Sequence, residues 1–487
     1  MSDARPRGLD TFFRPRGVAV VGASRSPSKV GHAVLRNLLY GGCRSVIQDR
    51  GRGFPGAIVP VNPSGEKILG LESCPRIDAL TGPIDLAVFA LPAPQIAAAL
   101  DGAARRGVRA AIVLSAGFFE MGREGRRLEA QLRSVAHNTG VRLIGPNCMG
   151  IFAAESRLQA SFYSGAPYLG PISLISQSGA IAQALVQYSH AEAIGLRHVV
   201  SIGDKVDVED AELIRYFARD EATRVIAVYL ESIDDPRAFY DAVREAAIIK
   251  PIVVLRGGKT GAGHRAAKVH EGLLGISDSS LDGALMHPGV YPTESLAGFL
   301  AAVRALAYQP PLRGRRVAIV TNGGGVGVLA TDRLAAAGLE VVRLAPDTTA
   351  RLAALVRNPR AAQNPIDLLG DARADTFVAA LRVVATAEEV DAILLLLTDQ
   401  AMTDAMEVAL KVCDVAQGLS KPLLASFIGL VGQPGEAHME THGVPVYDFP
   451  ELAVQGLAAL AARGAFEARL ERGRYRPYVR PKARGRW

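Results

Sequence analysis

Short apolar, often β-branched runs alternate with Ala- and Leu-rich stretches of helical period along most of this 487-residue chain. Before residue 150, the apolar runs are 18–21, 58–61, 86–90, 111–114 and 142–144. Continuous apolar strands joined by helices are typical of a parallel sheet that is covered by helices on both faces. The alternation therefore predicts an α/β fold.

The strand–loop–helix pattern restarts twice. Residues 172–175 are followed by Ser-Gln-Ser-Gly, and residues 317–320 are followed by Thr-Asn-Gly-Gly-Gly-Val-Gly. Because the two openings are alike in design, they predict two related flavodoxin-like domains. The length allows about three domains of roughly 150 residues each. The predicted divisions are domains at 8–150, 151–306 and 312–463, and a basic tail at 464–487.

The composition is that of a globular protein, with 49% hydrophobic and 21% charged residues. The first 17 residues lack the apolar stretch of a signal peptide, and the most apolar run, 392–397, is far shorter than a membrane span of roughly 20 residues. Cys43, Cys74, Cys148 and Cys413 form neither a disulfide framework nor a CxxC metal site. We expect a cytoplasmic protein without membrane contact and assign no metal ligands.

The net charge of +7 is concentrated at the C-terminal end. Residues 464–487 hold eight Lys or Arg and two Glu, which contribute +6 of it. We favour a solvated extension over a nucleic-acid-binding segment. Docking on an acidic partner subunit is a further alternative.

Residues 22–31, Gly-Ala-Ser-Arg-Ser-Pro-Ser-Lys-Val-Gly, follow the first predicted strand and open a helix. Such a loop lets backbone N–H groups approach a phosphate, whose charge the helix N-terminus stabilises. The spacing differs from GxGxxG, and Pro-Val-Asn-Pro at 60–63 stands where an NAD site needs an acidic ribose binder. The loop predicts a nucleotide-like ligand other than NAD, with a purely structural turn as the alternative.

Residues 13–24, Phe-Arg-Pro-Arg-Gly-Val-Ala-Val-Val-Gly-Ala-Ser, resemble the opening of the ADP-forming acyl-CoA synthetases in the succinyl-CoA synthetase superfamily. The resemblance covers nearly the whole chain, with further matching segments at 60–63, 68–70, 91–93, 115–118, 145–150, 364–370 and 397–404. It implies an N-terminal Rossmann-like CoA-binding domain followed by two flavodoxin-like domains of the succinyl-CoA synthetase type. The residues that it implies for the CoA site are Gly22, Ser24, Lys29, Gly31, Asn62, Pro63, Ser115 and Asn147.

His270 lies in a Gly-rich, basic stretch after the predicted strand 251–255. A histidine on an exposed loop can accept a phosphoryl group and hand it on. The family carries Ser-His-Thr-Gly where this chain has Val-His-Glu-Gly, so the resemblance implies a phosphohistidine at His270 and a ring-orienting carboxylate at Glu231. Glu271 would repel the phosphate. A non-catalytic, regulatory protein that binds CoA or acyl-CoA is therefore the alternative function.

The two restarts each place small residues at the beginning of a helix. Helix N-termini bind phosphate through free N–H groups and the helix dipole. By the resemblance, the pairs Ser178–Gly179 and Gly324–Gly325 bind the phosphate between them.

In the family a further ATP-grasp domain binds the nucleotide, whereas only the basic tail follows residue 462 of this sequence, which also has no Walker GxxxxGK[ST] loop. We therefore expect that this chain cannot use ADP or ATP alone. The resemblance implies a separate ATP-grasp β subunit, commonly in an α₂β₂ assembly, that binds ADP or ATP with Mg²⁺. The implied reaction is the reversible conversion of acyl-CoA, phosphate and ADP into a carboxylic acid, CoA and ATP, through an acyl phosphate and a phosphohistidine. The acyl group and the physiological direction stay open.

Overall fold

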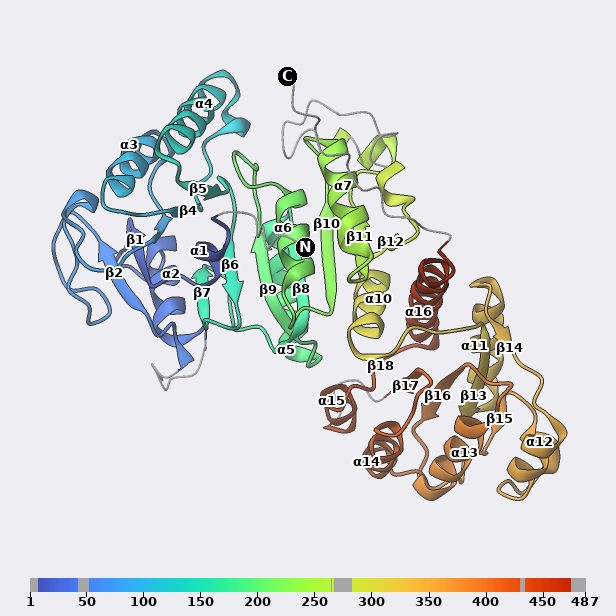
Figure 1. Ribbon diagram of the computed structural model, residues 1–487. Coiled ribbons are helices and arrows are strands. Elements are labelled where there is room, and N and C mark those ends of the chain that lie inside the picture. The colour runs from blue at the N-terminus through green and yellow to red at the C-terminus, as the bar shows by residue number, and fades with distance from the viewer. Residues whose placement is uncertain (1–7, 43–51, 264, 267–282, 430–433, 474–487) are drawn as a thin grey trace, which may run out of the picture. The chain divides into compact units, whose positions relative to one another are not determined.

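The computed structural model describes residues 8–42, 52–263, 265–266, 283–429 and 434–473 (Figure 1). The chain forms two compact units. The first comprises Met1–Ala242, Ile252–Leu285 and Pro292–Glu294, and the second comprises Val243–Pro251, Met286–Tyr291 and Ser295–Trp487. Three sheets lie within these units, two of them mainly in the first, and the predicted α/β fold class is confirmed.

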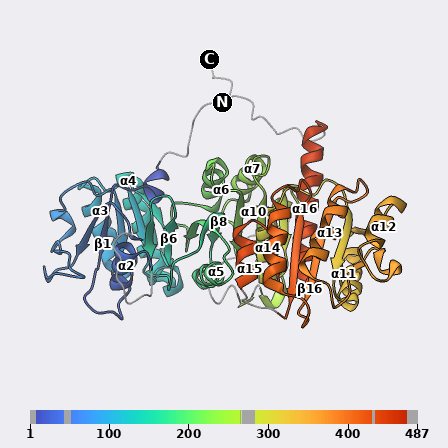
Figure 2. The same cartoon turned by 90° about the horizontal axis from the view of Figure 1, so that it is seen from below.

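The first sheet has the strand order β2-β1-β3-β4-β5, with every neighbouring pair parallel. The strands are β1 (Gly17–Val21), β2 (Ala57–Val61), β3 (Leu86–Phe89), β4 (Ala110–Val113) and β5 (Arg142–Ile144), each within one residue of its predicted ends. The helices are α1 (Asp10–Phe13), α2 (Val30–Tyr40), α3 (Ala93–Ala104) and α4 (Gly122–Thr139). Figure 2 shows α3 and α4 on one face of the sheet and α2 on the other. Because both faces are covered, β1, β3 and β4 are buried along their full length.

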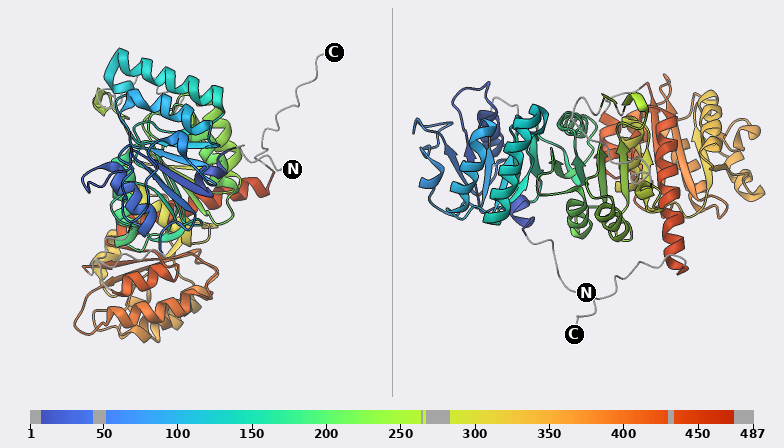
Figure 3. Two further views of the ribbon diagram at one scale, coloured as in Figure 1. Left: turned by 90° about the vertical axis from the view of Figure 1, so that its left-hand side faces the viewer. Right: turned by 90° about the horizontal axis from the view of Figure 1, so that it is seen from above.

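The second sheet has the order β12-β11-β10-β8-β9-β6-β7. Its strands are β6 (Gly150–Ala153), β7 (Leu158–Ser161), β8 (Leu169–Ser176), β9 (Leu196–Ser201), β10 (Val225–Leu230), β11 (Ile252–Arg256) and β12 (Val290–Thr293). Its helices are α5 (Gly179–Ala191), α6 (Asp210–Arg219) and α7 (Pro236–Ala247). Figure 2 labels α5 and α6 on opposite faces of this sheet, and Figure 3 shows the same ribbon without helix labels from two further sides. Strands β8 to β12 have the flavodoxin-like order, and the antiparallel β6–β7 hairpin extends the sheet beyond β9.

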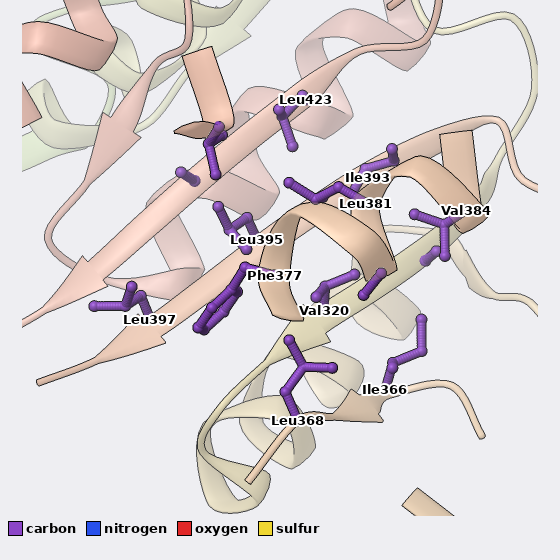
Figure 4. Packing of buried hydrophobic residues seen from close by; sticks show 14 of the residues in the cluster. Val320, Ile366, Leu368, Phe377, Leu381, Val384, Ile393, Leu395, Leu397 and Leu423 are labelled. Atoms are coloured by element: carbon purple, nitrogen blue, oxygen red, sulfur yellow. The ribbon is translucent and has the colours of Figure 1, made fainter. Parts of the chain in front are cut away.

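The third sheet, β14-β13-β16-β17-β18, repeats the flavodoxin-like order, with β15 also paired to β13. Its strands are β13 (Arg316–Thr321), β14 (Glu340–Val341), β15 (Ile366–Asp367), β16 (Ala392–Thr398), β17 (Leu423–Ile428) and β18 (Val446–Tyr447). The helices of this unit are α10 (Leu296–Tyr308), α11 (Gly324–Ala336), α12 (Pro346–Ala353), α13 (Ala374–Thr386), α14 (Ala405–Ala416), α15 (Pro434–Thr441) and α16 (Pro450–Glu471). Figure 4 shows Phe377, Leu381 and Val384 of α13 packed over apolar side chains of β13, β15 and β16. The two related flavodoxin-like folds therefore follow from the two restarts in the sequence.

Helix α16 continues through Glu471, eight residues into the segment assigned from sequence to the basic tail. Phe466 is 1% exposed and packs against His287, so this part of the helix is anchored in the second unit. The solvated extension can begin only after the helix. Although α16 has 22 residues, no helix in the described ranges is both long and apolar enough to cross a bilayer.

Candidate functional site

The first glycine loop, residues 22–29, connects β1 to α2 at the carboxyl end of the first sheet. Gly22 has a φ of +91°, which favours glycine, and a Cβ on Gly31 would lie 2.0 Å from the carbonyl oxygen of Gly22. Helix α2 therefore starts directly against the loop backbone. Its N-cap residue, Lys29, makes no side-chain cap, so the first N–H groups of α2 are left for a ligand. This geometry fits a diphosphate.

Neighbouring side chains hold the loop in place. The amide of Asn62, after β2, donates to the carbonyl of Ala23 at 2.7 Å, and its carbonyl oxygen accepts from the N–H of Ser64 at 2.8 Å. The carbonyl of Ser24 lies 2.9 Å from Nδ1 of His32 on α2. Asn62 therefore orients the loop, while Lys29 and Pro63 are exposed beside it. The structure brings these predicted CoA-site residues together.

The other two predicted CoA-site residues, Ser115 and Asn147, follow β4 and β5. The N–H of Asn147 donates to the carbonyl of Ser115 at 2.9 Å, and the Ser115 hydroxyl donates to the carbonyl of Leu91 at 2.5 Å. The exposed Asn147 side chain donates to Oδ1 of Asp204 at 3.3 Å. This contact connects the carboxyl end of the first sheet to the loop after β9 in the second sheet.

Gln177, for which the sequence predicted no role, connects the loops after β8 and β10 by hydrogen bonds. Its side-chain oxygen accepts the N–H groups of Glu231 at 2.7 Å and of Ser232 at 2.8 Å. Its amide nitrogen donates to Oδ2 of Asp210 at 2.9 Å. Strands β8 and β10 are neighbours at the switch point of the flavodoxin-like order, where α/β proteins bind ligands. Gln177 thus fixes the backbone on which Glu231 stands.

Glu231 lies directly after β10, beside Gly257 at the end of β11. A Cβ on Gly257 would lie 3.5 Å from Cγ of Glu231. The Glu231 carboxylate is half-buried and makes no hydrogen bond to another residue in the described ranges. The structure therefore leaves the carboxylate able to accept a hydrogen bond, and its orienting role stays a prediction.

The N-terminus of α5 lies close to the loop that carries Asn147. A Cβ on Gly179 would lie 2.7 Å from Cγ of Met149. The Ser178 hydroxyl accepts the N–H of Ile181 at 3.3 Å, which satisfies one of the free N–H groups of the helix. The remaining N–H groups of the first turn can still bind an anion.

The third sheet repeats the Gln177 contact with Asn322, which follows β13. The Asn322 side-chain oxygen accepts the N–H of Thr398, at the end of β16, at 2.8 Å, and its amide nitrogen donates to the Thr398 carbonyl at 2.9 Å. Helix α11 then begins at Gly324 without a side-chain cap, and Gly325 has open space where a Cβ would stand. Because α5 and α11 belong to different units, their joint binding of one phosphate stays a prediction.

A small polar cavity lies beside this loop system in the first unit. Its volume is about 200 Å³, and it is lined among others by Phe119, Gln177, Asp204, Lys205 and Asp234. Lys205 Nζ donates to the carbonyl of Ser232 at 3.1 Å and lies 3.6 Å from Asp234 Oδ2. The catalytic candidate His270 lies outside the described residues.

Asp204 gives a testable pH dependence. Its Oδ2 is buried without a hydrogen-bond partner among the described residues, and burial, aided by repulsion from Glu120 and Glu129, raises the pKa of its carboxyl to about 7. An unfolded aspartate has a pKa of about 3.9. The folded state therefore holds more protons between pH 4 and 7, and stability should fall with rising pH across that window by up to about 4 kcal/mol.

Asp204→Asn removes this titration, so we expect the variant to have a higher Tm than the unaltered chain at pH 8. The advantage should disappear near pH 4, where both forms of residue 204 are neutral. Thermal unfolding by circular dichroism at the two pH values measures the difference. The exposed Asp332→Asn is the matched control and should show no such pH-dependent gain. An equal Tm of Asp204→Asn and the unaltered chain at pH 8 would contradict the prediction.

Comparison with known families matches each sheet to a family model. Residues 16–154 match the CoA binding domain, residues 169–306 match the succinyl-CoA ligase like flavodoxin domain, and residues 317–469 match the Ligase-CoA domain.

Full-length relatives and solved structures agree with these matches. The chain is 34% identical to the α subunit of acetate–CoA ligase [ADP-forming] I of Pyrococcus furiosus, over 93% of this chain and 97% of that relative. It is 33% identical to acetate–CoA ligase [ADP-forming] I of Archaeoglobus fulgidus, over 95% of this chain but 64% of that longer relative. Among solved structures it is similar to the dinucleotide-forming acetyl-coenzyme A synthetase 1 of Candidatus Korarchaeum cryptofilum in complex with phosphate and ADP. That match has a TM-score of 0.86 and 31% identity, and it covers 97% of this chain and 99% of the other.

Proposed function

The chain belongs to the ADP-forming acetate–CoA ligase family, and from this membership we propose that it is the α subunit of an ADP-forming acyl-CoA synthetase. The overall reaction converts acyl-CoA, phosphate and ADP into a carboxylic acid, CoA and ATP, and it is reversible. The single observation that carries the proposal is the continuous similarity to an α subunit of almost the same length. The loop geometry in the first unit supports it.

CoA is bound at the carboxyl end of the first sheet. Its diphosphate lies against the first glycine loop and the N-terminus of α2, where Gly31 approaches Gly22 closely and no side chain caps the first N–H groups of the helix. Ser24 and Lys29 add donors, and Asn62 holds the loop. Pro63, Ser115 and Asn147 complete the CoA site.

The chemistry runs through two intermediates. An oxygen of phosphate attacks the thioester carbon, the carbon–sulfur bond breaks, and CoA leaves as the thiolate. An imidazole nitrogen of His270 then attacks phosphorus in the acyl phosphate, and the carboxylate leaves. Glu231, held by Gln177, accepts a hydrogen bond from the other ring nitrogen and so orients the imidazole. Ser178–Gly179 and Gly324–Gly325 bind the phosphoryl oxygens.

A partner subunit supplies the nucleotide site. The similar Pyrococcus furiosus protein is an α subunit, which supports a partner subunit for this chain, and the Archaeoglobus fulgidus relative has further sequence beyond the part that this chain matches. We propose an ATP-grasp β subunit that holds ADP or ATP with Mg²⁺, in an α₂β₂ assembly. Phosphohistidine formation from acyl-CoA and phosphate needs only this chain, whereas ATP synthesis needs the partner.

The test separates these two half-reactions. The purified chain is incubated with phosphate and a panel of acyl-CoAs, and its intact mass is measured under alkaline conditions that preserve phosphohistidine. We expect the gain of one acid-labile phosphoryl group with at least one thioester, which also names the acyl class. ATP should form from ADP only after the β subunit is added.

One result would overturn the enzymatic proposal. If the chain binds acyl-CoA but takes up no phosphoryl group with any thioester, nor from ATP in the presence of the β subunit, it is a CoA-binding regulatory protein. Glu271, which stands next to His270, is the feature that favours this second function.

A further inference from the structure

A thiol and two imidazoles meet where α14 packs against α15 in the second unit. Cys413, on α14, is 2% exposed, His438 lies in the last turn of α15, and His442 follows that turn. One potential ligand atom from each residue lies within 4.8 Å of the other two. No role could be predicted for these residues from the sequence, because the cysteine lies far from the two histidines along the chain.

A close helix contact produces this cluster. A Cβ on Gly435 of α15 would lie 3.1 Å from Cβ of Ala409 on α14, so the absence of a side chain lets the helices approach. Cys413 lies one helical turn after Ala409, and His438 lies about one turn after Gly435. The same contact therefore places the thiol beside the imidazoles. Met439, which follows His438 in the sequence, is fully buried and anchors the end of α15.

The hydrogen bond of His442 leaves one of its ring nitrogens available to an ion, and the His438 ring lies next to it. Nδ1 of His442 lies 2.7 Å from the carbonyl oxygen of His438, so a proton on Nδ1 leaves Nε2 with a free lone pair. Histidines that bind metals commonly donate their other N–H to a carbonyl in this way. The ring centroids are 4.0 Å apart with an interplanar angle of 31°, which places both rings on the same side of the helix end.

We propose that Cys413, His438 and His442 bind one zinc ion, with water as the fourth ligand. Mixed thiolate and imidazole ligands suit zinc. In a tetrahedral zinc site the ligand atoms stand roughly 3.3–3.6 Å apart, so side-chain rotations must close the cluster by about 1 Å. His442 is exposed and leaves a side open to water. The inference depends on the second unit alone and does not rest on the proposed function.

The thiol must lose its proton when zinc binds. A bound cation replaces that proton, because zinc is ligated by the thiolate.

The test uses the full-length, untagged chain after removal of metal by a chelator. It is titrated with Co²⁺, which reports thiolate ligation by a near-ultraviolet charge-transfer band, and then with Zn²⁺ in competition with a chromophoric chelator. We expect one equivalent of Co²⁺ with that band, displaced by Zn²⁺, and a Tm that rises when Zn²⁺ is present.

Variants identify the ligands. His442→Gln, at an exposed position, should weaken Zn²⁺ binding by about 100-fold or more, and Cys413→Ser should abolish the charge-transfer band. The matched control is His190→Gln, an exposed histidine near the C-terminal end of α5, and it should bind Zn²⁺ like the unaltered chain. Absence of the band in the unaltered chain, or its persistence in Cys413→Ser, would overturn the proposal. Unchanged affinity in His442→Gln would do the same.

Discussion

His270→Ala is expected to abolish phosphoryl uptake from acyl-CoA and phosphate and to lower turnover of the complete enzyme by about 10⁴-fold or more. The imidazole nitrogen forms the bond to phosphorus, and a methyl group offers no lone pair in its place. Binding of acyl-CoA should persist, because the proposed CoA residues lie on other loops. Intact mass spectrometry under alkaline conditions measures phosphoryl uptake, and calorimetric titration measures CoA binding.

Two further variants make this result specific. His264→Ala removes the other histidine of the same Gly-rich stretch and should still be phosphorylated. Glu231→Gln keeps the hydrogen bonds between the Glu231 backbone and Gln177 but weakens the orientation of the imidazole, so it should slow phosphorylation by about 10²–10⁴-fold without preventing it. Phosphorylation of His270→Ala at the normal rate would refute the assignment of the carrier.

Gly31→Ala is expected to reduce CoA affinity by about 30-fold or more. The added Cβ would lie 2.0 Å from the carbonyl oxygen of Gly22 and 2.8 Å from its carbonyl carbon. Both are backbone atoms, so no side-chain rotation can relieve the clash, and either the first glycine loop or the start of α2 must move. Overpacking of this kind costs about 1–3 kcal/mol, and 2 kcal/mol corresponds to about 30-fold in a dissociation constant.

Gly107→Ala is the matched control for that substitution. Gly107 lies in the same sheet domain, after α3, with a φ of +87° and no atom within 4 Å of an added Cβ. It should cost about 1 kcal/mol of stability through backbone strain and leave CoA affinity unchanged. Calorimetric titration with CoA, with circular dichroism as a check on folding, compares the two variants. Equal CoA affinity of Gly31→Ala and the unaltered chain would show that the loop does not bind the diphosphate.

Most of the fold could be predicted from the alternation of apolar runs and helical segments in the sequence. Buried parallel strands must be apolar along their whole length, and such runs are visible without any tertiary information, which is why the predicted β1 to β5 agree with the observed strands. The restarts at Ser176 and Thr321 likewise predicted two related domains, and both sheets contain five strands in the flavodoxin-like order. Family membership, predicted from local motifs, is confirmed by the full-length relatives.

The candidate site residues could be predicted only in part. The glycine loop that contains Gly22 and Gly31 was predictable from sequence because a loop between a strand and a helix is local. Gln177 and Asn322 belong to the two loop motifs, but their roles could not be predicted from them. Gln177 binds the backbone of a residue 54 positions away in the sequence, and Asn322 binds one that is 76 positions away. The sequence did contain one indication of a shared role, because an amide residue follows the first strand of both flavodoxin-like domains.

The sequence by itself therefore determined the fold class, the family and the glycine loop, since each depends on the period of apolar residues or on contiguous motifs. Tertiary structure alone decided which polar groups meet. It buried one oxygen of Asp204 without a hydrogen-bond partner among the described residues, and it placed Cys413 beside His438 and His442 across a helix contact. Burial and proximity between distant segments arise from packing, because a side chain's pKa and its potential as a ligand depend on neighbours that the local sequence does not contain.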